Sequence, residues 1–463
     1  MYPDRGSPAG RRLLTVERSI HMNRPIRQAA LLLTTLLMTI SMAACSGDPA
    51  PAESGIASPE PGSAASTEEG GTSMNSSTDP TSGGTTASPS SDAGSNPTVP
   101  APSLSAEDAA KRINNVDGYG VNKVATDKGN VYTPAVGWGY AHHPHIAHFK
   151  GTFYATFSQG RENEDDCGQR IMLSTSKDGL SWSTPEPLID SVQGKESELV
   201  LVNAGVYTDG ERLIVYYGSY EYRADTLRGP NLRPLEDAHR IDYAMHLVST
   251  TDGSTWSAPQ KMTIPFGCNF GPLPLQSGRL LMCGGTTYPY TDDPTGLTGF
   301  ITGKIDGAEA VSRGAKIINE GSFFQTDDGV IYMMLRTNTK FLWCSRSEDN
   351  GATWSKAYQT NFTDSSTKFQ FGRLPDGRFF YVGSPIPGSN RNPLMLCLSE
   401  DGQNFNRQFI LRNESYKQQI PGLYKGGVYG YPSTVIADGY MYVIYSKHKE
   451  AIEVTRVALS MLA

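Results

Sequence analysis

The sequence predicts an all-β fold, a six-bladed β-propeller that follows a disordered N-terminal tether. Three observations predict it. Glycine-containing turns recur six times between strand-like runs, a second turn type with an aspartate and an aromatic residue alternates with them, and helical periodicity is nearly absent after Asn115. Repeats that each form one small sheet are typical of radial repetition.

Composition and charge restrict the class of protein. The chain of 463 residues is 38% hydrophobic and 19% charged, with 48 Gly and 30 Pro, which fits one large loop-rich domain and a tail. The net charge is -7 and no long basic run occurs. Nothing in this charge pattern attracts a nucleic acid, so we expect none as a partner.

Residues 1–45 have the features of an export signal. Arg24 and Arg27 precede an apolar run of roughly a dozen residues, too short to span a membrane comfortably. The tetrapeptide MAAC at 42–45 resembles the bacterial lipobox, in which the cysteine is lipidated. The resemblance implies a bacterial cell-surface protein anchored through lipid on Cys45; the alternative is a plain cleavage site beside an ordinary cysteine.

Residues 46–105 consist mainly of Ser, Thr, Gly, Pro, Ala and acidic residues. With almost no side chains to bury, such a segment cannot offset its ordering entropy, and we expect a disordered linker. The folded domain is then expected over 106–463. Its five cysteines show no metal-ligand spacing and are interpreted as small buried hydrophobes, with a Cys268–Cys283 disulfide as an alternative.

The first turn type gives the number of blades. It occurs at 150–151, 209–210, 277–278, 328–329, 376–377 and 438–439, and the intervals between its glycines are 59, 68, 51, 48 and 62 residues. Each copy is followed by a run of aromatic and β-branched residues with the strand signature. Six copies predict six blades.

The second turn type is SKDGLSW (176–182), TTDGSTW (250–256), SEDNGATW (347–354) and SEDGQNF (399–405). These segments resemble the Asp-box of bacterial neuraminidase-type repeats. The aspartate can accept backbone N–H groups inside the turn, the glycine supplies the positive φ, and the aromatic residue fills the space between sheets. We therefore interpret the boxes as structural, and IDGAEAV near Asp306 as a degenerate copy in the third blade.

Candidate site positions follow from propeller geometry. The first strand of each blade lines the central channel, and its entry end opens on the face that binds ligands. Counting back eight or nine residues from each turn glycine selects mostly polar residues: His142, Leu201 with Glu198 and Asn203 nearby, Asn269, Glu320, Lys368 and Tyr431. Such convergence predicts a functional pocket, in which Asn269 would contact substrate.

The segments at 320–336, 391–402 and 429–459 then resemble sialidases in order and spacing, and the resemblance covers roughly residues 115–463. It implies that Tyr431 is a nucleophile and that Glu320 accepts its proton, because a phenol with a pKa near 10 is a poor nucleophile when unassisted. It also implies that Arg336 and Arg391 hold a substrate carboxylate. The alternative is a purely structural role, in which the tyrosine packs in a sheet and Glu320 and Arg336 form an ion pair within one blade.

The acidic loop ENEDD at 162–166 lies where sialidases carry their acid. Asp165 or Asp166 would protonate the departing sugar oxygen. The alternatives are that these aspartates only solvate the loop, or that they bind calcium together with Glu162 and Glu164. Arg161, at the end of the preceding strand, is a candidate substrate contact.

The triplet His142-His143-Pro144 departs from the sialidase pattern, which has Arg-Ile-Pro at this place. A histidine there would supply a third charge that titrates near pH 6.5, so carboxylate binding would weaken by roughly 1.5–3 kcal/mol. His142 or His143 could instead act as a general acid or base. The histidine-rich opening resembles that of rhamnosyl-glucuronate hydrolases and ulvan-type lyases, and these two histidines with Tyr431 and Arg336 would serve elimination.

Together these observations predict an exo-glycosidase of the sialidase superfamily that acts on a terminal acidic sugar. A uronate-directed lyase or rhamnosidase on the same scaffold is the first alternative, and a non-catalytic carbohydrate-binding propeller is the second. A glycan is the expected partner, the membrane is contacted only through the lipid, and we expect a monomer without a required cofactor.

Overall fold

The computed structural model describes residues 113–115, 122–236, 239–388 and 390–463. Regular structure in these ranges is almost entirely β, with one five-residue helix, α2 (Ala308–Ser312), and the 3-10 turns η1 (Ala224–Thr226) and η3 (Leu459–Leu462). The all-β prediction is confirmed. The predicted export signal, Cys45 and the linker lie outside the described residues.

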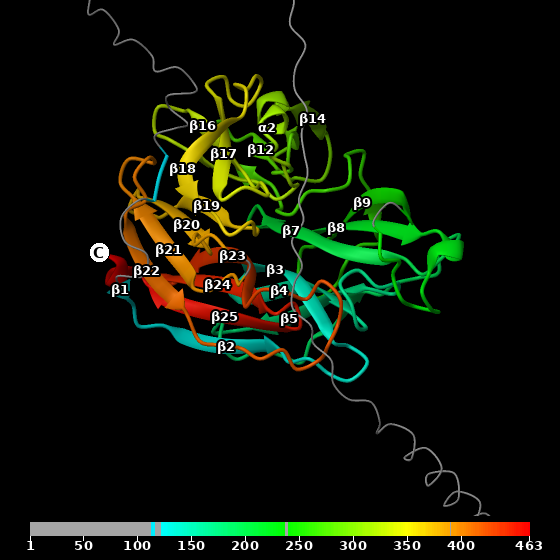
Figure 1. The fold of residues 1–463 in the computed structure, drawn as a ribbon. Coiled ribbons are helices and arrows are strands. Elements are labelled where there is room, and N and C mark those ends of the chain that lie inside the picture. Colours follow the sequence, from blue (N-terminus) through cyan, green and yellow to red (C-terminus); the bar gives the residue numbers. More distant parts are fainter. Residues whose placement is uncertain (1–112, 116–121, 237–238, 389) are drawn as a thin grey trace, which may run out of the picture. The chain divides into compact units, whose positions relative to one another are not determined.

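The strands form six sheets, which are the blades of a β-propeller (Figure 1), as predicted. The first blade contains β3 (Tyr140–Phe149), β4 (Thr152–Gly160), β5 (Arg170–Ser176) and β6 (Glu186–Ile189), and the second contains β7 (Val200–Thr208), β8 (Leu213–Tyr222), β9 (Arg240–Thr250) and β10 (Gln260–Lys261). The third blade contains β11 (Leu273–Pro274), β12 (Leu280–Leu281), β13 (Thr287–Thr291) and β14 (Ile301–Lys304). The fourth contains β15 (Ser322–Gln325), β16 (Ile331–Leu335), β17 (Phe341–Ser347) and β18 (Tyr358–Thr363).

The fifth and sixth blades include strands from the N-terminal side of the domain. The fifth is β19 (Gln370–Arg373), β20 (Phe379–Gly383), β21 (Leu394–Ser399) and β22 (Arg407–Arg412), extended by β1 (Asn122–Lys123). The sixth is β23 (Tyr429–Ala437), β24 (Tyr440–Lys447) and β25 (Ala451–Ala458), completed by β2 (Asp127–Tyr132). Because β2 pairs antiparallel with β25, the last blade is closed by the strand that precedes the first.

The predicted glycine turns connect the first and second strands of all six blades. Each turn glycine has a positive φ, between 70° and 95°. Glycine is the residue that adopts this conformation without a steric penalty, which is why the turn motif can be recognised in the sequence.

The predicted Asp-boxes connect the third and fourth strands of blades one, two, four and five. In the first box, the carboxylate of Asp178 accepts the backbone N–H groups of Leu180 (2.9 Å) and Ser181 (2.7 Å), and the indole of Trp182 donates to the carbonyl of Gly179 (3.2 Å). The boxes lie in the turns of the sheets and stabilise them, as expected.

The equivalent turn in the third blade is not at Asp306. It lies between β13 and β14, where Asp293 accepts the N–H groups of Thr295 (2.9 Å) and Thr298 (3.0 Å). Asp306 follows β14 and accepts the N–H of Ala308, and Gly307 has a φ of -99°. The prediction was wrong because it relied on the Asp-Gly dipeptide, whereas the turn depends on an aspartate whose carboxylate can accept the backbone N–H groups that follow it.

The cores lie between neighbouring blades. The contact of the fourth and fifth blades, for example, is filled by stacked and edge-on rings of Phe324, Phe362, Phe371 and Phe405. All five described cysteines are free and buried, so the Cys268–Cys283 disulfide does not form and the interpretation as small hydrophobes is confirmed. None of the described helices is long and apolar enough to cross a membrane.

Candidate active site

Backbone bulges set up the site. The first strands β3, β7 and β23 each lose register once, between His142 and His145, Asn203 and Gly205, and Gly430 and Ser433. In β3 and β23 the bulge contains a residue in the left-handed region before a proline: His143 has a φ of 52° and Tyr431 a φ of 56°. Such conformations cost about 1–3 kcal/mol and concentrate at functional sites.

The bulges break the alternation of side chains along a strand, and therefore both His142 and His143 face Tyr431. The ring centroid of His142 lies 3.9 Å from that of Tyr431, and the ring of His143 lies 5.1 Å from it. The two histidine rings are 4.6 Å apart. Strands from the first and sixth blades thus meet in one aromatic cluster.

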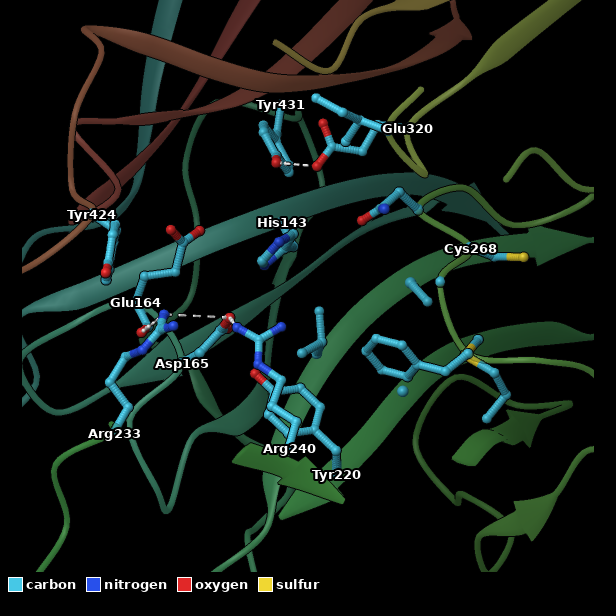
Figure 2. Close-up of a pocket in the computed structure, with 18 of the residues that line it drawn as sticks. His143, Glu164, Asp165, Tyr220, Arg233, Arg240, Cys268, Glu320, Tyr424 and Tyr431 are labelled. Carbon is cyan, nitrogen blue, oxygen red and sulfur yellow. Dashed lines mark hydrogen bonds and ion pairs between the residues drawn. The ribbon is translucent and has the colours of Figure 1, made fainter. Parts of the chain in front are cut away.

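Tyr431, Glu320 and Arg336 form a buried polar cluster. The hydroxyl of Tyr431 donates to the carboxylate of Glu320 (Figure 2), and Arg336 donates through Nη1 to Glu320 and, at 3.2 Å, to the Tyr431 oxygen. Glu320 lies just before β15 and Arg336 just after β16, so three residues from two blades converge. Sequence reasoning named all three, and the structure brings them together.

Electrostatics keeps the Tyr431 phenol protonated in the free protein. Burial raises its pKa, and the charge of Glu164 adds to this effect, while Arg336 and Arg391 act in the opposite direction. The phenol therefore needs a base in order to act as a nucleophile, and Glu320 is the carboxylate hydrogen-bonded to it.

Two guanidinium groups lie beside Tyr431. Arg336 donates through Nη2 to the carbonyl of Ser366 (2.5 Å). Arg391 has a φ of 52°, and its guanidinium carbon lies 6.0 Å from the centre of the Tyr431 ring. Its buried Nη1 has no hydrogen-bond partner among the described residues. A ligand carboxylate is the kind of group that would satisfy it.

Two cavities adjoin this cluster. The larger, of about 650 Å³, is lined by His143, Asp165, Tyr220, Asn269, Glu320 and Tyr431 among others. The second, of about 540 Å³, is lined by Lys340, Asp364, Ser366, Arg391 and Lys449 among others. Glu164 and Tyr424 line both cavities, so the two cavities adjoin at these side chains.

His142 and His143 are buried and uncharged. Burial lowers the pKa of His143 to about 3 and that of His142 well below 6.5, and the positive charges of Lys368 and Lys449 act in the same direction on both. The expectation of a third positive charge titrating near pH 6.5 was therefore wrong. It neglected the cost of charging an imidazole inside a protein that already holds several cations nearby.

The acidic loop holds Asp165 and Asp166 in different environments. Asp166 is fully buried and accepts the N–H groups of Asn163 (2.7 Å) and Arg233 (3.0 Å), which fixes the loop and keeps the carboxylate away from the cavity. Asp165 lines the cavity and pairs with Arg240 at 2.9 Å (Figure 2). Of the two predicted acids, only Asp165 reaches the candidate site.

The charge state of Asp165 is set by its neighbours. Burial alone would raise its pKa, but the charges of Arg240 and Arg233 outweigh burial, and the pKa lies below its ordinary value. Asp165 is thus a carboxylate in the free protein. The loop does not gather its carboxylates around one point, since Glu164 pairs with Lys449 at 2.6 Å and Asp165 with Arg240. This arrangement does not fit the calcium alternative.

The two remaining predicted contacts differ in their position. Arg161 donates through Nη1 to Glu198 (2.6 Å) and to the carbonyl of Cys167 (2.8 Å), and it does not line either cavity. Its guanidinium holds the acidic loop against the second blade. Asn269 lines the larger cavity and donates to the carbonyl of Asn319 (2.7 Å), which leaves its oxygen available to a ligand.

Sequence reasoning did not identify Lys449 or Asp364 as site residues. Lys449 follows β24 with a φ of 53° and donates to both oxygens of Glu164, at 2.7 and 2.6 Å. Asp364 is buried at the wall of the second cavity, where burial raises its pKa to about 7. Their only sequence signals are the basic run at 447–449 and the Asp-Ser-Ser turn at 364–366, and both patterns are common.

Six blades, Asp-box turns and a buried Tyr-Glu-Arg cluster beside a cavity define a sialidase-like β-propeller. The family model for the BNR repeat-like domain matches residues 151–443. The chain therefore belongs to the BNR repeat-like domain family.

Solved structures of sialidases share the fold. One described as a sialidase is 21% identical with a TM-score of 0.54, over 74% of this chain and 34% of the other. The NanB sialidase from Streptococcus pneumoniae is 13% identical with a TM-score of 0.52, over 72% of this chain and 71% of the other. The intramolecular trans-sialidase from Ruminococcus gnavus is also 13% identical, with a TM-score of 0.53, over 72% of this chain and 98% of the other. This chain thus spans about a third of the first. None of the curated proteins compared matches it in sequence.

Proposed function

We propose that this protein is an exo-glycosidase that removes a terminal acidic sugar, of the sialic acid type, with Tyr431 as nucleophile. The observation that carries the proposal is the buried Tyr431–Glu320–Arg336 cluster at the wall of a cavity large enough for a sugar. A tyrosine that donates to a carboxylate and lies within reach of a guanidinium is equipped for covalent catalysis.

The reaction follows a double displacement. The Tyr431 oxygen attacks the anomeric carbon while its proton passes to Glu320, and the glycosidic carbon–oxygen bond breaks as the acid protonates the departing oxygen. Water then attacks the anomeric carbon and gives its proton to the conjugate base of that acid. The Tyr431 phenolate regains its proton from Glu320, and the sugar leaves with its configuration retained.

Asp165 is the proposed acid. It lines the same cavity as Tyr431, whereas the buried Asp166 does not. In the free protein Asp165 is ion-paired with Arg240, which lines the same cavity. A bound sugar that takes up the Arg240 hydrogen bond would leave the buried Asp165 carboxyl without that partner, and such a carboxyl takes up a proton more readily.

Arg336 and Arg391 are the proposed carboxylate clamp. Arg391 contributes a buried Nη1 that lacks a protein partner among the described residues. His142 stands where sialidases have a further arginine and is uncharged, so one charge-assisted bond is missing, worth roughly 1.5–3 kcal/mol. We infer weaker binding of sialic acid than in an enzyme with three arginines.

The experiment that tests the proposal is release of the fluorescent aglycone from a fluorogenic sialoside by the full chain. Tyr431→Phe should lower turnover by at least roughly 10³-fold, while Tyr440→Phe, on the same hairpin but outside both cavities, should not. Release that survives Tyr431→Phe would contradict the nucleophile assignment.

One observation favours a second candidate, a uronate-directed lyase or rhamnosidase. The uncharged rings of His142 and His143 pack on Tyr431, and an uncharged imidazole can remove the proton beside a uronate carboxylate. Incubation with uronate polysaccharides distinguishes the candidates, because elimination produces the ultraviolet absorbance of an unsaturated uronate without hydrolysis. No reaction on either substrate would favour the binding-only alternative.

We further propose that the protein acts on the bacterial cell surface, anchored through lipid on Cys45. The support is the lipobox-like tetrapeptide at 42–45 and the long polar segment after it. Cys45→Ala should move the full chain from the membrane fraction to the soluble extracytoplasmic fraction, as measured by fractionation and immunoblotting. Retention of this variant in the membrane would contradict the anchor.

A further inference from the structure

The strongest unexplained feature is a pair of buried imidazoles with unused ring nitrogens. Nε2 of His142 and Nδ1 of His143 are both buried, and neither has a hydrogen-bond partner among the described residues. The residues are 0% and 7% exposed. A buried nitrogen without a partner costs roughly 1–3 kcal/mol, so its retention calls for an explanation.

The tautomer of His142 follows from its neighbours. The Ser446 hydroxyl donates to the carbonyl of Gly430 (3.2 Å), so its oxygen is left to accept from Nδ1 of His142 (2.7 Å). The Ser446–Gly430 hydrogen bond thus favours the tautomer with the proton on Nδ1, in which Nε2 presents a bare lone pair. Metal-bound histidines are oriented in the same way, by a hydrogen bond from their other nitrogen.

A third ligand group lies close to the two imidazoles. Glu164 lies on the loop after β4. One of its carboxylate oxygens and one ring nitrogen of each histidine are all within 4.8 Å of one another. Zinc binds nitrogen and oxygen ligands at about 2.0–2.2 Å, so two ligands of one ion lie within roughly 4 Å of each other. Side-chain shifts on the order of 1 Å would close the site around one ion.

We propose that His142, His143 and Glu164 form a binding site for a divalent transition-metal ion, with zinc as the best match. Two imidazoles and one carboxylate with an open fourth position are a frequent ligand set for zinc. The bulge at His143 is what brings two adjacent side chains to the same side.

Several cations lie near this site, and Lys449 competes with the ion directly. Lys449 donates to both oxygens of Glu164 and would share that carboxylate with the metal. Removing the Lys449 ammonium should tighten metal binding, whereas its loss would have no such effect if the histidines only pack.

The test is calorimetric titration of chelator-treated full chain with zinc chloride at neutral pH, without substrate. We expect one equivalent to bind, roughly tenfold or more weaker binding in His142→Ala, His143→Ala and Glu164→Gln, and tighter binding in Lys449→Met. His148→Ala, on the same strand but outside the cluster, is the matched control and should bind as the wild type does.

Cobalt substitution supplies a second readout, because four-coordinate Co²⁺ in a protein site absorbs visible light more strongly than hydrated Co²⁺, and this absorption should disappear in the ligand variants. Circular dichroism of each variant shows whether it is folded. The proposal is overturned if the folded wild type takes up no stoichiometric ion, or if the ligand variants bind as tightly as His148→Ala. Because no substrate is present, either result is independent of the proposed glycosidase activity.

Discussion

Asp364 is a buried carboxyl whose proton is tied to folding. Burial raises its pKa to about 7, and the nearby Arg336 and the N–H groups of Ser365 and Ser366 only partly oppose this. Between pH 4 and 7 the folded protein thus holds a proton that the unfolded chain has released. The contribution of Asp364 to stability is therefore lost as the pH rises through this window.

We predict that Asp364→Asn flattens the pH dependence of unfolding. Relative to the wild type, the variant should gain roughly 2–4 kcal/mol between pH 4 and pH 8, because its side chain cannot ionise. Urea denaturation at a series of pH values measures this. The control is Asp209→Asn, at an exposed turn. An unchanged slope in the Asp364 variant would contradict the assignment.

Individual site residues were predictable to different degrees. Tyr431 and Glu320 were found by counting because distance from a turn along a strand is local geometry. Arg161 and Asp166 were predicted to contact the substrate, but they bond to Glu198 and Asn163 instead. These partners could not be predicted because they depend on the path of a loop. The uncharged state of His143 could not be read from the sequence either, because burial and neighbouring cations decide it.

At the scale of elements, the bulges explain the architecture of the site. The bulge in β7 includes Gly205, with a φ of 138°. A Cβ placed on Gly205 would lie 1.9 Å from the backbone nitrogen of Gly271, and one placed on Gly271 would lie 2.1 Å from the carbonyl oxygen of Val206. The second and third blades therefore approach each other backbone to backbone, which only paired glycines allow.

We predict that Gly205→Ala is strongly destabilising, by at least roughly 3 kcal/mol, because the neighbouring atom is backbone and cannot move aside. Gly210→Ala is the matched control, since it has a positive φ but nothing within 4 Å of its Cβ. It should cost only about 1 kcal/mol. Thermal denaturation of both variants measures the difference, and equal melting temperatures would contradict this account of the contact.

Blades and turns were predictable from the sequence because both are encoded locally, by alternation over a strand and by the φ of one glycine. The bulges were not predictable, since no residue type requires them, although His143 and Tyr431 each precede a proline. The third Asp-box was misplaced for a related reason, because Asp293 makes the turn hydrogen bonds within a segment that does not contain the Asp-Gly sequence.

At the scale of the whole molecule, the pairing of β2 with β25 closes the ring of six blades. The outer strand of the sixth blade, β2, pairs with β25, and Arg456 forms an ion pair with Asp127 at 2.6 Å. Val131 of β2 is buried in the cluster between the sixth and first blades. Among the described residues, β2 is the strand that joins the N-terminal end of the domain to its last blade through sheet hydrogen bonds.

We predict that Val131→Asp detaches this strand. A charge placed in an apolar contact without a partner costs several kcal/mol, so the midpoint of urea unfolding should fall clearly. Val136→Asp, at a residue that is 98% exposed, is the matched control and should leave the midpoint unchanged. A wild-type midpoint for Val131→Asp would show that β2 contributes little.

The position of the site at this closure has a consequence for biosynthesis. His142 and Ser446, which hydrogen-bond inside the site, are 304 residues apart in the chain, and Tyr431 belongs to β23 of the last blade. During synthesis the first blade emerges long before its partner. A ribosome-bound or truncated chain that lacks the last blade therefore has neither Tyr431 nor a closed ring, so the candidate site can form only when translation is nearly complete.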